Sequence, residues 1–244
     1  MKKYLIESLG TCLLVMFGCG AGLVGFDYFN ILGVAATFAL FFCFWNFIAG
    51  KFSACHLNPV VSLAAFILNK LSIKEFFGYA LWQFIGAIVG SFILLFYISL
   101  SSDATKLLTS CSYWVACFAE YSSYNTSIIA AVIIEIVLTF VLVLTFIIMY
   151  YKYNKSKYAG LIIAGVYFIV IICGFNFTGA CVNPARGLGP ALIYLIMGSP
   201  LVILQFIPIF ISNIVGSLFA VLAFRFLFKE ECKDTKISAL NYNA

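Results

Sequence analysis

The residues of this 244-residue chain that are best placed to do chemistry are two Asn-Pro pairs. They occur in Asn58-Pro59-Val60 and Asn183-Pro184-Ala185, 125 positions apart, and each opens a short apolar stretch. Asparagine followed by proline suits a helix start, because the Asn side chain caps free backbone N–H groups and proline fits the first turn. The Asn amides can also donate hydrogen bonds, so the pairs are candidate contacts for a neutral, hydrogen-bonding solute.

A cation and the only histidine lie next to these pairs. Arg186 follows the second pair, in the first turn of the helix that it opens. It either snorkels to a membrane interface or faces a pore and repels cations, and the cost of an intramembrane charge favours the pore. His56 lies two residues before Asn58. A structural, hydrogen-bonded role that supports the loop is favoured over pH gating, the switch that histidine chemistry permits.

Two carboxylates recur in the same way. Glu7-x-x-x-Thr11 matches Glu135-x-x-x-Thr139 at an offset of 128. As a pair we expect them to anchor backbone N–H groups of the two loops, and a proton relay through Glu135 is the alternative. No nucleophile and base occur together at motif spacing, and no CxxC or Cys/His cluster indicates a metal. The sequence therefore predicts neither an enzyme nor a metal or other cofactor.

The composition identifies the solvent of this chain as lipid. Hydrophobic residues make up 64% and charged residues 9%, whereas about a quarter of a soluble domain is charged. Disordered chains have low hydrophobicity, so disorder is excluded as well. The net charge of +5 includes no basic run of the kind that binds nucleic acid. Membrane lipid is therefore the expected partner, and nucleic acid is not.

Six apolar stretches come near or exceed the ~20 residues that cross a membrane as a helix. They are Tyr4–Gly25, Ile31–Gly50, Phe76–Leu100, Ile128–Tyr151, Tyr158–Phe175 and Pro200–Phe228. Two shorter stretches, Pro59–Leu68 and Pro184–Ile196, reach only about halfway across at ~1.5 Å per residue. Half-spans are tolerated only where protein or a watery cavity surrounds their ends. An all-α membrane protein with six transmembrane helices and two re-entrant half-helices is predicted.

The basic residues set the expected orientation. Apart from Lys106 and Arg186, all of them fall on one side of a six-span arrangement: Lys2, Lys3, Lys51, Lys70, Lys74, Lys152, Lys155, Lys157, Arg225, Lys229, Lys233 and Lys236. The positive-inside rule then puts both termini in the cytoplasm, and we expect the plasma membrane. Ser101–Ser127 becomes the long outer loop, in which Cys111 and Cys117 could pair if that side is oxidising.

Internal matches at nearly constant offset indicate a duplication. Besides the Asn-Pro and Glu-x-x-x-Thr pairs, Ile88-Val89-Gly90-Ser91 recurs as Ile214-Val215-Gly216-Ser217, 126 positions on. A single domain, 1–244, thus contains two three-span repeats, at about 4–100 and 128–228. Since each repeat crosses three times, the second is inverted, and the functional site is expected where the repeats meet near the midplane.

The two motif segments, Ser53-Ala54-Cys55-His56-Leu57-Asn58-Pro59-Val60 and Thr178-Gly179-Ala180-Cys181-Val182-Asn183-Pro184-Ala185-Arg186, resemble those of the major intrinsic proteins, the aquaporins and aquaglyceroporins. The resemblance runs from Tyr4 to about Phe228, and Val60 replaces the family's usual Ala. It implies a right-handed aquaporin-like bundle and a homotetramer with one pore per subunit.

The resemblance also implies a constriction, or selectivity filter, at four positions: Phe38, Ile171, Ala180 and Arg186. Strict water channels of the family usually have His at the position of Ile171, and glycerol channels typically have an aromatic residue at that of Ala180. We therefore expect a wider or less polar filter. The predicted function is a passive water channel that excludes ions and protons and leaves room for glycerol or other small neutral solutes. A glycerol facilitator and an ion-coupled secondary transporter are the alternatives.

Overall fold

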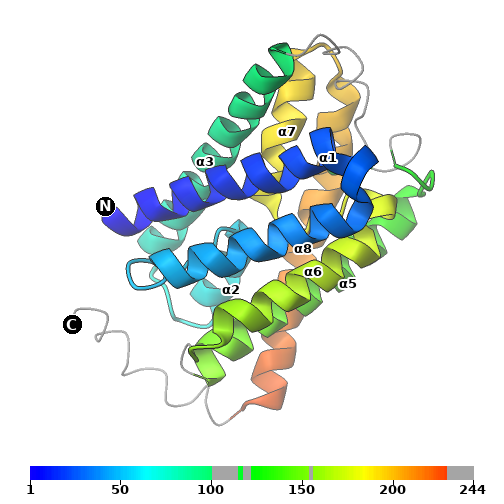
Figure 1. Ribbon diagram of the computed structural model, residues 1–244. Coiled ribbons are helices and arrows are strands. Elements are labelled where there is room, and N and C mark those ends of the chain that lie inside the picture. Colours follow the sequence, from blue (N-terminus) through cyan, green and yellow to red (C-terminus); the bar gives the residue numbers. More distant parts are fainter. Residues whose placement is uncertain (101–114, 118–121, 154–155, 230–244) are drawn as a thin grey trace.

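The computed structural model describes residues 1–100, 115–117, 122–153 and 156–229, and only the backbone of residues 24, 25 and 27. The elements in these ranges are all helices (Figure 1). Six segments within them are long and apolar enough to cross a membrane: Lys2–Leu23, Tyr28–Ala49, Ile73–Ser99, Ile128–Lys152, Ala159–Thr178 and Pro200–Leu227. The expected all-α membrane fold with six long spans is confirmed.

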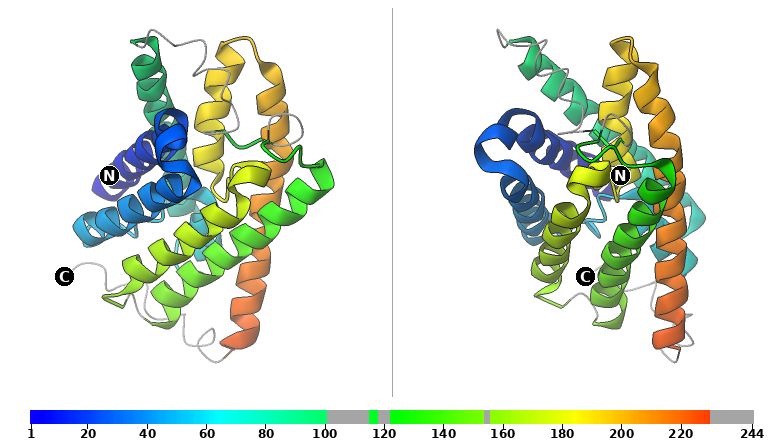
Figure 2. Two further views of the ribbon diagram at one scale, coloured as in Figure 1. Left: turned by 45° about the vertical axis from the view of Figure 1, so that its right-hand side comes forward. Right: turned by 90° about the vertical axis from the view of Figure 1, so that its right-hand side faces the viewer.

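Helix α1 (Lys2–Ala49) contains the first two spans. The chain reverses direction within it, so that its two halves run side by side as the blue hairpin of Figures 1 and 2. Asn30, near the reversal, has a non-helical backbone with φ of 48°. Its side-chain oxygen accepts a hydrogen bond from the Leu32 N–H at 2.9 Å, which supports the start of the second half.

The other long helices are α3 (Ile73–Ser99), α5 (Ile128–Ile147), α6 (Ala159–Thr178) and α8 (Pro200–Leu227). Local chemistry explains where their ends differ from the predicted ones. Helix α3 begins three residues before the expected Phe76, because Ser72 and Glu75 form a reciprocal capping box. Helix α6 continues beyond Phe175 to Thr178, where Gly179 ends it in the left-handed conformation with φ of 73°. The last turn before Lys152 is a π-helix, η2 (Ile148–Lys152).

The two half-helices are α2 (Pro59–Ile67) and α7 (Pro184–Ile196), and they enter from opposite ends of the bundle (Figure 1). At ~1.5 Å per residue α2, with 9 residues, covers about 14 Å and α7, with 13, about 20 Å of the ~30 Å hydrocarbon core. Each begins at its Asn-Pro pair, and the proline lies in the first turn, where no N–H is required. Their N-terminal ends therefore meet inside the bundle.

The long helices pack in matching pairs, α1 against α3 and α5 against α8 (Figure 2). Glycines permit the close approach in both pairs. A Cβ at Gly86 of α3 would lie 2.0 Å from the Ser8 carbonyl oxygen, and one at Gly90 would lie 2.4 Å from that of Cys12. At Gly216 of α8, which corresponds to Gly90, a Cβ would lie 2.6 Å from the Ile136 carbonyl oxygen. Backbone thus contacts backbone at corresponding crossings of the two halves, as expected of an inverted repeat.

Gly86→Ala should destabilise the protein, because the added methyl group meets main-chain atoms that cannot rotate away. We expect overpacking to cost about 1–3 kcal/mol and to lower the thermal unfolding midpoint in detergent. The control is Gly165→Ala in α6, where a Cβ has no heavy atom within 4 Å. Equal midpoints for the two variants would contradict this account of the crossing.

Candidate functional site

The two Asn side chains link the half-helices to each other. Asn58 donates from Nδ2 to the Val182 carbonyl oxygen at 2.9 Å, and Asn183 donates to that of Leu57 at 2.7 Å. Their Oδ1 atoms accept from the first turns of their own helices: Asn58 from the Val60 N–H, and Asn183 from those of Ala185 and Arg186. Each amide group has two hydrogens, so each retains one for a further acceptor.

The Glu7 carboxylate fixes the loop before α2. It accepts hydrogen bonds from the His56 N–H at 3.1 Å and the Leu57 N–H at 2.8 Å. The Ser53 hydroxyl and the Gln83 amide, the latter at 2.9 Å, also donate to it. Because Glu7 is fully buried, these donors take the place of the water that it has lost.

Glu135 does the same for the loop before α7. It accepts from the Cys181 N–H at 2.7 Å, the Val182 N–H at 2.9 Å and the Thr178 hydroxyl at 2.5 Å. The Asn213 amide of α8 donates to it at 2.8 Å. Three of these four donors lie 125 positions after the corresponding donors to Glu7. The inverted repeat therefore extends to single hydrogen bonds.

Both loops contain residues with strained backbones, again in matching pairs. The values of φ are 49° at Cys55 and Leu57, 46° at Ala180 and 43° at Val182. Left-handed backbone costs a residue with a Cβ roughly 1–2 kcal/mol. The carboxylate hydrogen bonds to neighbouring N–H groups offset that cost and hold the loops in place.

All four expected filter residues are buried in the structure. The Arg186 guanidinium lies over the Phe38 ring, 5.5 Å from its centroid, and Arg186 is only 1% exposed. This burial argues against an arginine that snorkels to the interface. None of the described residues accepts a hydrogen bond from its Nε, Nη1 or Nη2. Ile171 is fully buried in α6, so it adds an apolar surface and no donor.

Ala180 and Val60 are buried in the loop contacts. A Cβ at Gly174 would lie 3.0 Å from the Ala180 Cβ, so Ala180 packs close to α6. The Val60 carbonyl oxygen accepts from the Ser217 hydroxyl of α8 at 2.7 Å. Val60, which stands in place of the family's usual Ala, thus links the start of α2 to α8 through its main chain.

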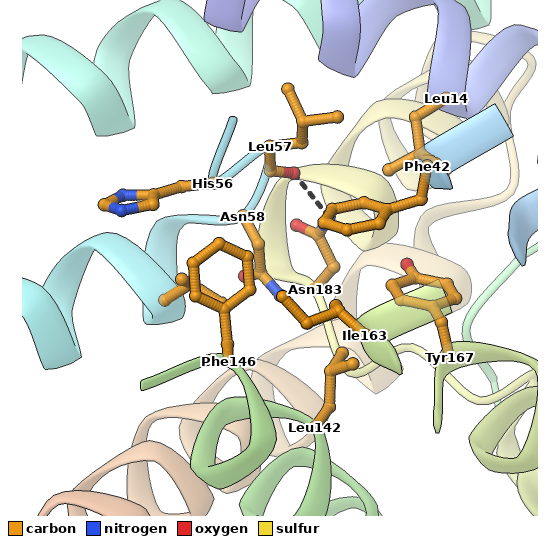
Figure 3. Close-up of a pocket in the computed structure, with 11 residues that line it drawn as sticks. Leu14, Phe42, His56, Leu57, Asn58, Leu142, Phe146, Ile163, Tyr167 and Asn183 are labelled. Carbon is orange, nitrogen blue, oxygen red and sulfur yellow. Dashed lines mark hydrogen bonds between the residues drawn. The ribbon is translucent and has the colours of Figure 1, made fainter. Parts of the chain in front are cut away.

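A narrow cavity lies beside the Asn pair (Figure 3). It leaves about 10 Å³ for a water-sized molecule, roughly the room of one water. Its wall is mostly apolar, with four polar side chains among its residues: Leu14, Phe42, His56, Leu57, Asn58, Val61, Leu142, Phe146, Ile163, Tyr167 and Asn183. Such a wall offers a small hydrogen-bonding molecule a few polar contacts on a mostly apolar surface.

His56 lines this cavity at the end of the α2 loop. Its Nδ1 lies 3.0 Å from the Ser62 hydroxyl, and its ring meets Phe146 edge to face at 5.4 Å. Its N–H donates to Glu7. These contacts favour the structural role over the gating role that the sequence left open.

A family model described as "Major intrinsic protein" matches residues 1–224. The chain belongs to the major intrinsic protein family. Aquaporin Z of Rhodopseudomonas palustris is 30% identical to it, over 78% of this chain and 80% of its own length. Glycerol uptake facilitator protein-like 6 of Lactiplantibacillus plantarum is 29% identical, over 79% and 84%. Aquaporin AqpM of Methanothermobacter marburgensis is also 29% identical, over 94% and 98%.

The fold of this major intrinsic protein also matches a solved structure. The aquaglyceroporin from Plasmodium falciparum aligns with a TM-score of 0.77, over 91% of this chain and 94% of its own. At 23% identity this likeness establishes the fold. Together with the six apolar helices, family membership makes the chain an integral, multi-pass membrane protein.

Sequence reasoning missed several residues of the site. Gln83 and Asn213 donate to the two carboxylates from α3 and α8, and neither belongs to a matched pair. Tyr167 and Phe42 line the cavity. Helical spacing could have found these last two, since each lies four residues from an expected filter position and shares its helix face.

The segment predicted to be the outer loop contacts the α7 loop through residues 115–117. Cys117 donates from its N–H to the Thr178 carbonyl oxygen at 3.2 Å. A Cβ at Gly179 would lie 2.5 Å from the Val115 carbonyl oxygen, so glycine is required there. Cys117 is buried, and Cys111 lies outside the described residues, so a bond between these two cysteines stays a prediction.

Glu135→Gln should destabilise the α7 loop strongly. The new NH₂ group would face N–H donors, and at least one buried donor would lose its acceptor, at a cost of about 3 kcal/mol. The matched control is Glu75→Gln, since Glu75 binds Lys3 at 2.6 Å with both side chains 35% exposed. Surface pairs contribute about 1 kcal/mol or less. Thermal unfolding in detergent tests this, and equal shifts would contradict the anchoring role.

Proposed function

We infer that this chain is a passive transmembrane channel for water that excludes ions and protons and also conducts small neutral solutes such as glycerol. The observation that carries this proposal is the pair of Asn amides beside a narrow cavity, each with one N–H left to donate. A molecule that accepts from both is oriented by them, which interrupts a chain of proton-conducting waters.

Charge near the cavity supports the exclusion of cations. A helix N-terminus carries roughly half a positive charge, and α2 and α7 direct theirs toward one point. The buried Arg186 guanidinium adds a full charge. A cation that passes must approach all three, whereas a neutral solute is not repelled.

The range of solutes rests on two filter positions. Ile171 offers no hydrogen-bond donor and Ala180 little bulk, so both favour a path that is less strict than one for water alone. The names of the relatives support the same range, since they include an aquaporin and a glycerol uptake facilitator. The second candidate function is a channel whose main role is to conduct glycerol. Ile171 and Ala180 favour this function as well.

An ion-coupled transporter fits the structure less well. Proton exchange at Glu135 would have to release donors that hold the α7 loop. Uptake that saturates, depends on an ion gradient and is lost on neutralising Glu135 in a folded protein would favour this alternative.

The family resemblance and the charge distribution support the rest of the proposal. We propose cytoplasmic termini, because six crossings leave both ends on one side and the basic residues cluster there. The plasma membrane as location and a homotetramer with one pore per subunit complete it.

Stopped-flow light scattering on proteoliposomes tests the function. Vesicles that contain the protein should shrink faster than empty ones under an osmotic gradient, and a proton gradient across them should persist. Shrinkage no faster than that of empty vesicles would refute the proposal. Rapid collapse of the proton gradient would refute its selectivity.

Ala180→Phe and Ile171→His should reduce glycerol permeability more than water permeability. A bulky ring narrows the filter and an imidazole makes it more polar, so we expect a loss of about tenfold or more for glycerol with a smaller loss for water. The control is Ile169→Phe, because Ile169 of α6 is 58% exposed and is not one of the four filter positions. Equal losses for both solutes would show that these positions are not the filter.

A further inference from the structure

Tyr167 is a buried tyrosine in the wall of the cavity beside the Asn pair. It lies in α6 and lines the cavity that Asn58 and Asn183 also line (Figure 3). The residue is 3% exposed. Its hydroxyl lies beside the Asn183 side chain, and none of the described residues is placed to form a full hydrogen bond with it. A buried tyrosine hydroxyl usually has a partner, so this one is available to a molecule in the cavity.

Tyr167 lies one helical turn from the expected filter. It precedes Ile171 by four residues in α6, so the two share a helix face about 6 Å apart along the axis. On the facing wall, Phe42 follows Phe38 by the same interval. The Tyr167 ring stacks on both phenylalanines, with centroids 5.7 Å from Phe38 and 6.1 Å from Phe42. These contacts orient the ring and leave its hydroxyl one helical turn inward of the filter.

The hydroxyl has a chemistry that its polar neighbours lack. Arg186 and Asn183 both lie near it, and both have only donors to offer, since a guanidinium has no acceptor and the Asn183 oxygen is occupied by its own helix. A tyrosine hydroxyl donates and accepts. A solute hydroxyl needs both a donor for its oxygen and an acceptor for its hydrogen. Tyr167 therefore supplies the acceptor that the donors leave missing.

We propose that the Tyr167 hydroxyl is a further solute-selecting group, which hydrogen-bonds the hydroxyl groups of polyols such as glycerol, one at a time, between the filter and the Asn pair. It adds, one turn further in, a polar group that Ile171 does not provide. The proposal deepens the proposed function and rests on it. Water depends less on this group, because a water molecule in single file also bonds to the waters before and after it.

The test is Tyr167→Phe, which removes the oxygen and keeps the stacked ring. The matched control is Tyr79→Phe, because Tyr79 is also 3% exposed but does not line the cavity. Both variants and the wild type are reconstituted at equal density, and water and glycerol permeabilities are measured by stopped flow. Gel filtration and the thermal midpoint check that each variant is folded.

We expect Tyr167→Phe to lower the ratio of glycerol to water permeability about threefold to tenfold, the worth of one net hydrogen bond. Tyr79→Phe should leave that ratio as in the wild type. An unchanged ratio in Tyr167→Phe, or the same change in both variants, would overturn the proposal. A wild type that conducts water but not glycerol would also overturn it and leave the channel function standing. A wild type that conducts neither would refute the function itself.

Discussion

The structure depends on one constraint: two helix starts with polar, strained backbone are buried in the middle of a membrane protein. Lipid offers no hydrogen bonds, and each unsatisfied backbone group there costs several kcal/mol. Glu7 and Glu135 meet this constraint, because each accepts two backbone N–H groups and a hydroxyl of one loop. The half-helices stay apart from lipid only while these carboxylates hold their loops.

The same constraint explains why hydrogen-bond donors gather where the two half-helices begin. A helix that begins inside the protein presents N–H groups toward its start, and here two helices begin at one point. The Asn side chains satisfy part of these groups and link the halves, so the loops form one unit. The Asn58 and Asn183 side chains line the cavity beside that unit, and each keeps one amide hydrogen to donate. A hydrogen-bond acceptor for a solute has to come from another element, and the Tyr167 hydroxyl of α6 is such an acceptor.

Most of the fold could be predicted from the sequence, because a helix that crosses lipid requires a long apolar stretch that is easy to recognise. Six apolar stretches gave the spans, and the Asn-Pro pairs gave the starts of both half-helices. The ends of the spans were less predictable, since the Ser72–Glu75 capping box and Gly179 act locally, beyond the apolar pattern. Gln83 and Asn213 were missed because each anchors a carboxylate from a different place in its repeat. Their part depends on how helices pack, which spacing in one repeat does not reveal.

The two halves agree where the fold requires it and differ where a solute would pass. The anchoring residues occur in matching pairs, such as Ser53 with Thr178, because both loops face the same problem. Around the cavity the match is only partial: Asn58 corresponds to Asn183, but other residues differ. Arg186 corresponds to Val61, 125 positions earlier, and Val61 is an apolar part of the cavity wall. The internal match thus gives the two halves a common frame, and under the proposed function selectivity arises where one half carries a charge or a hydroxyl that the other lacks.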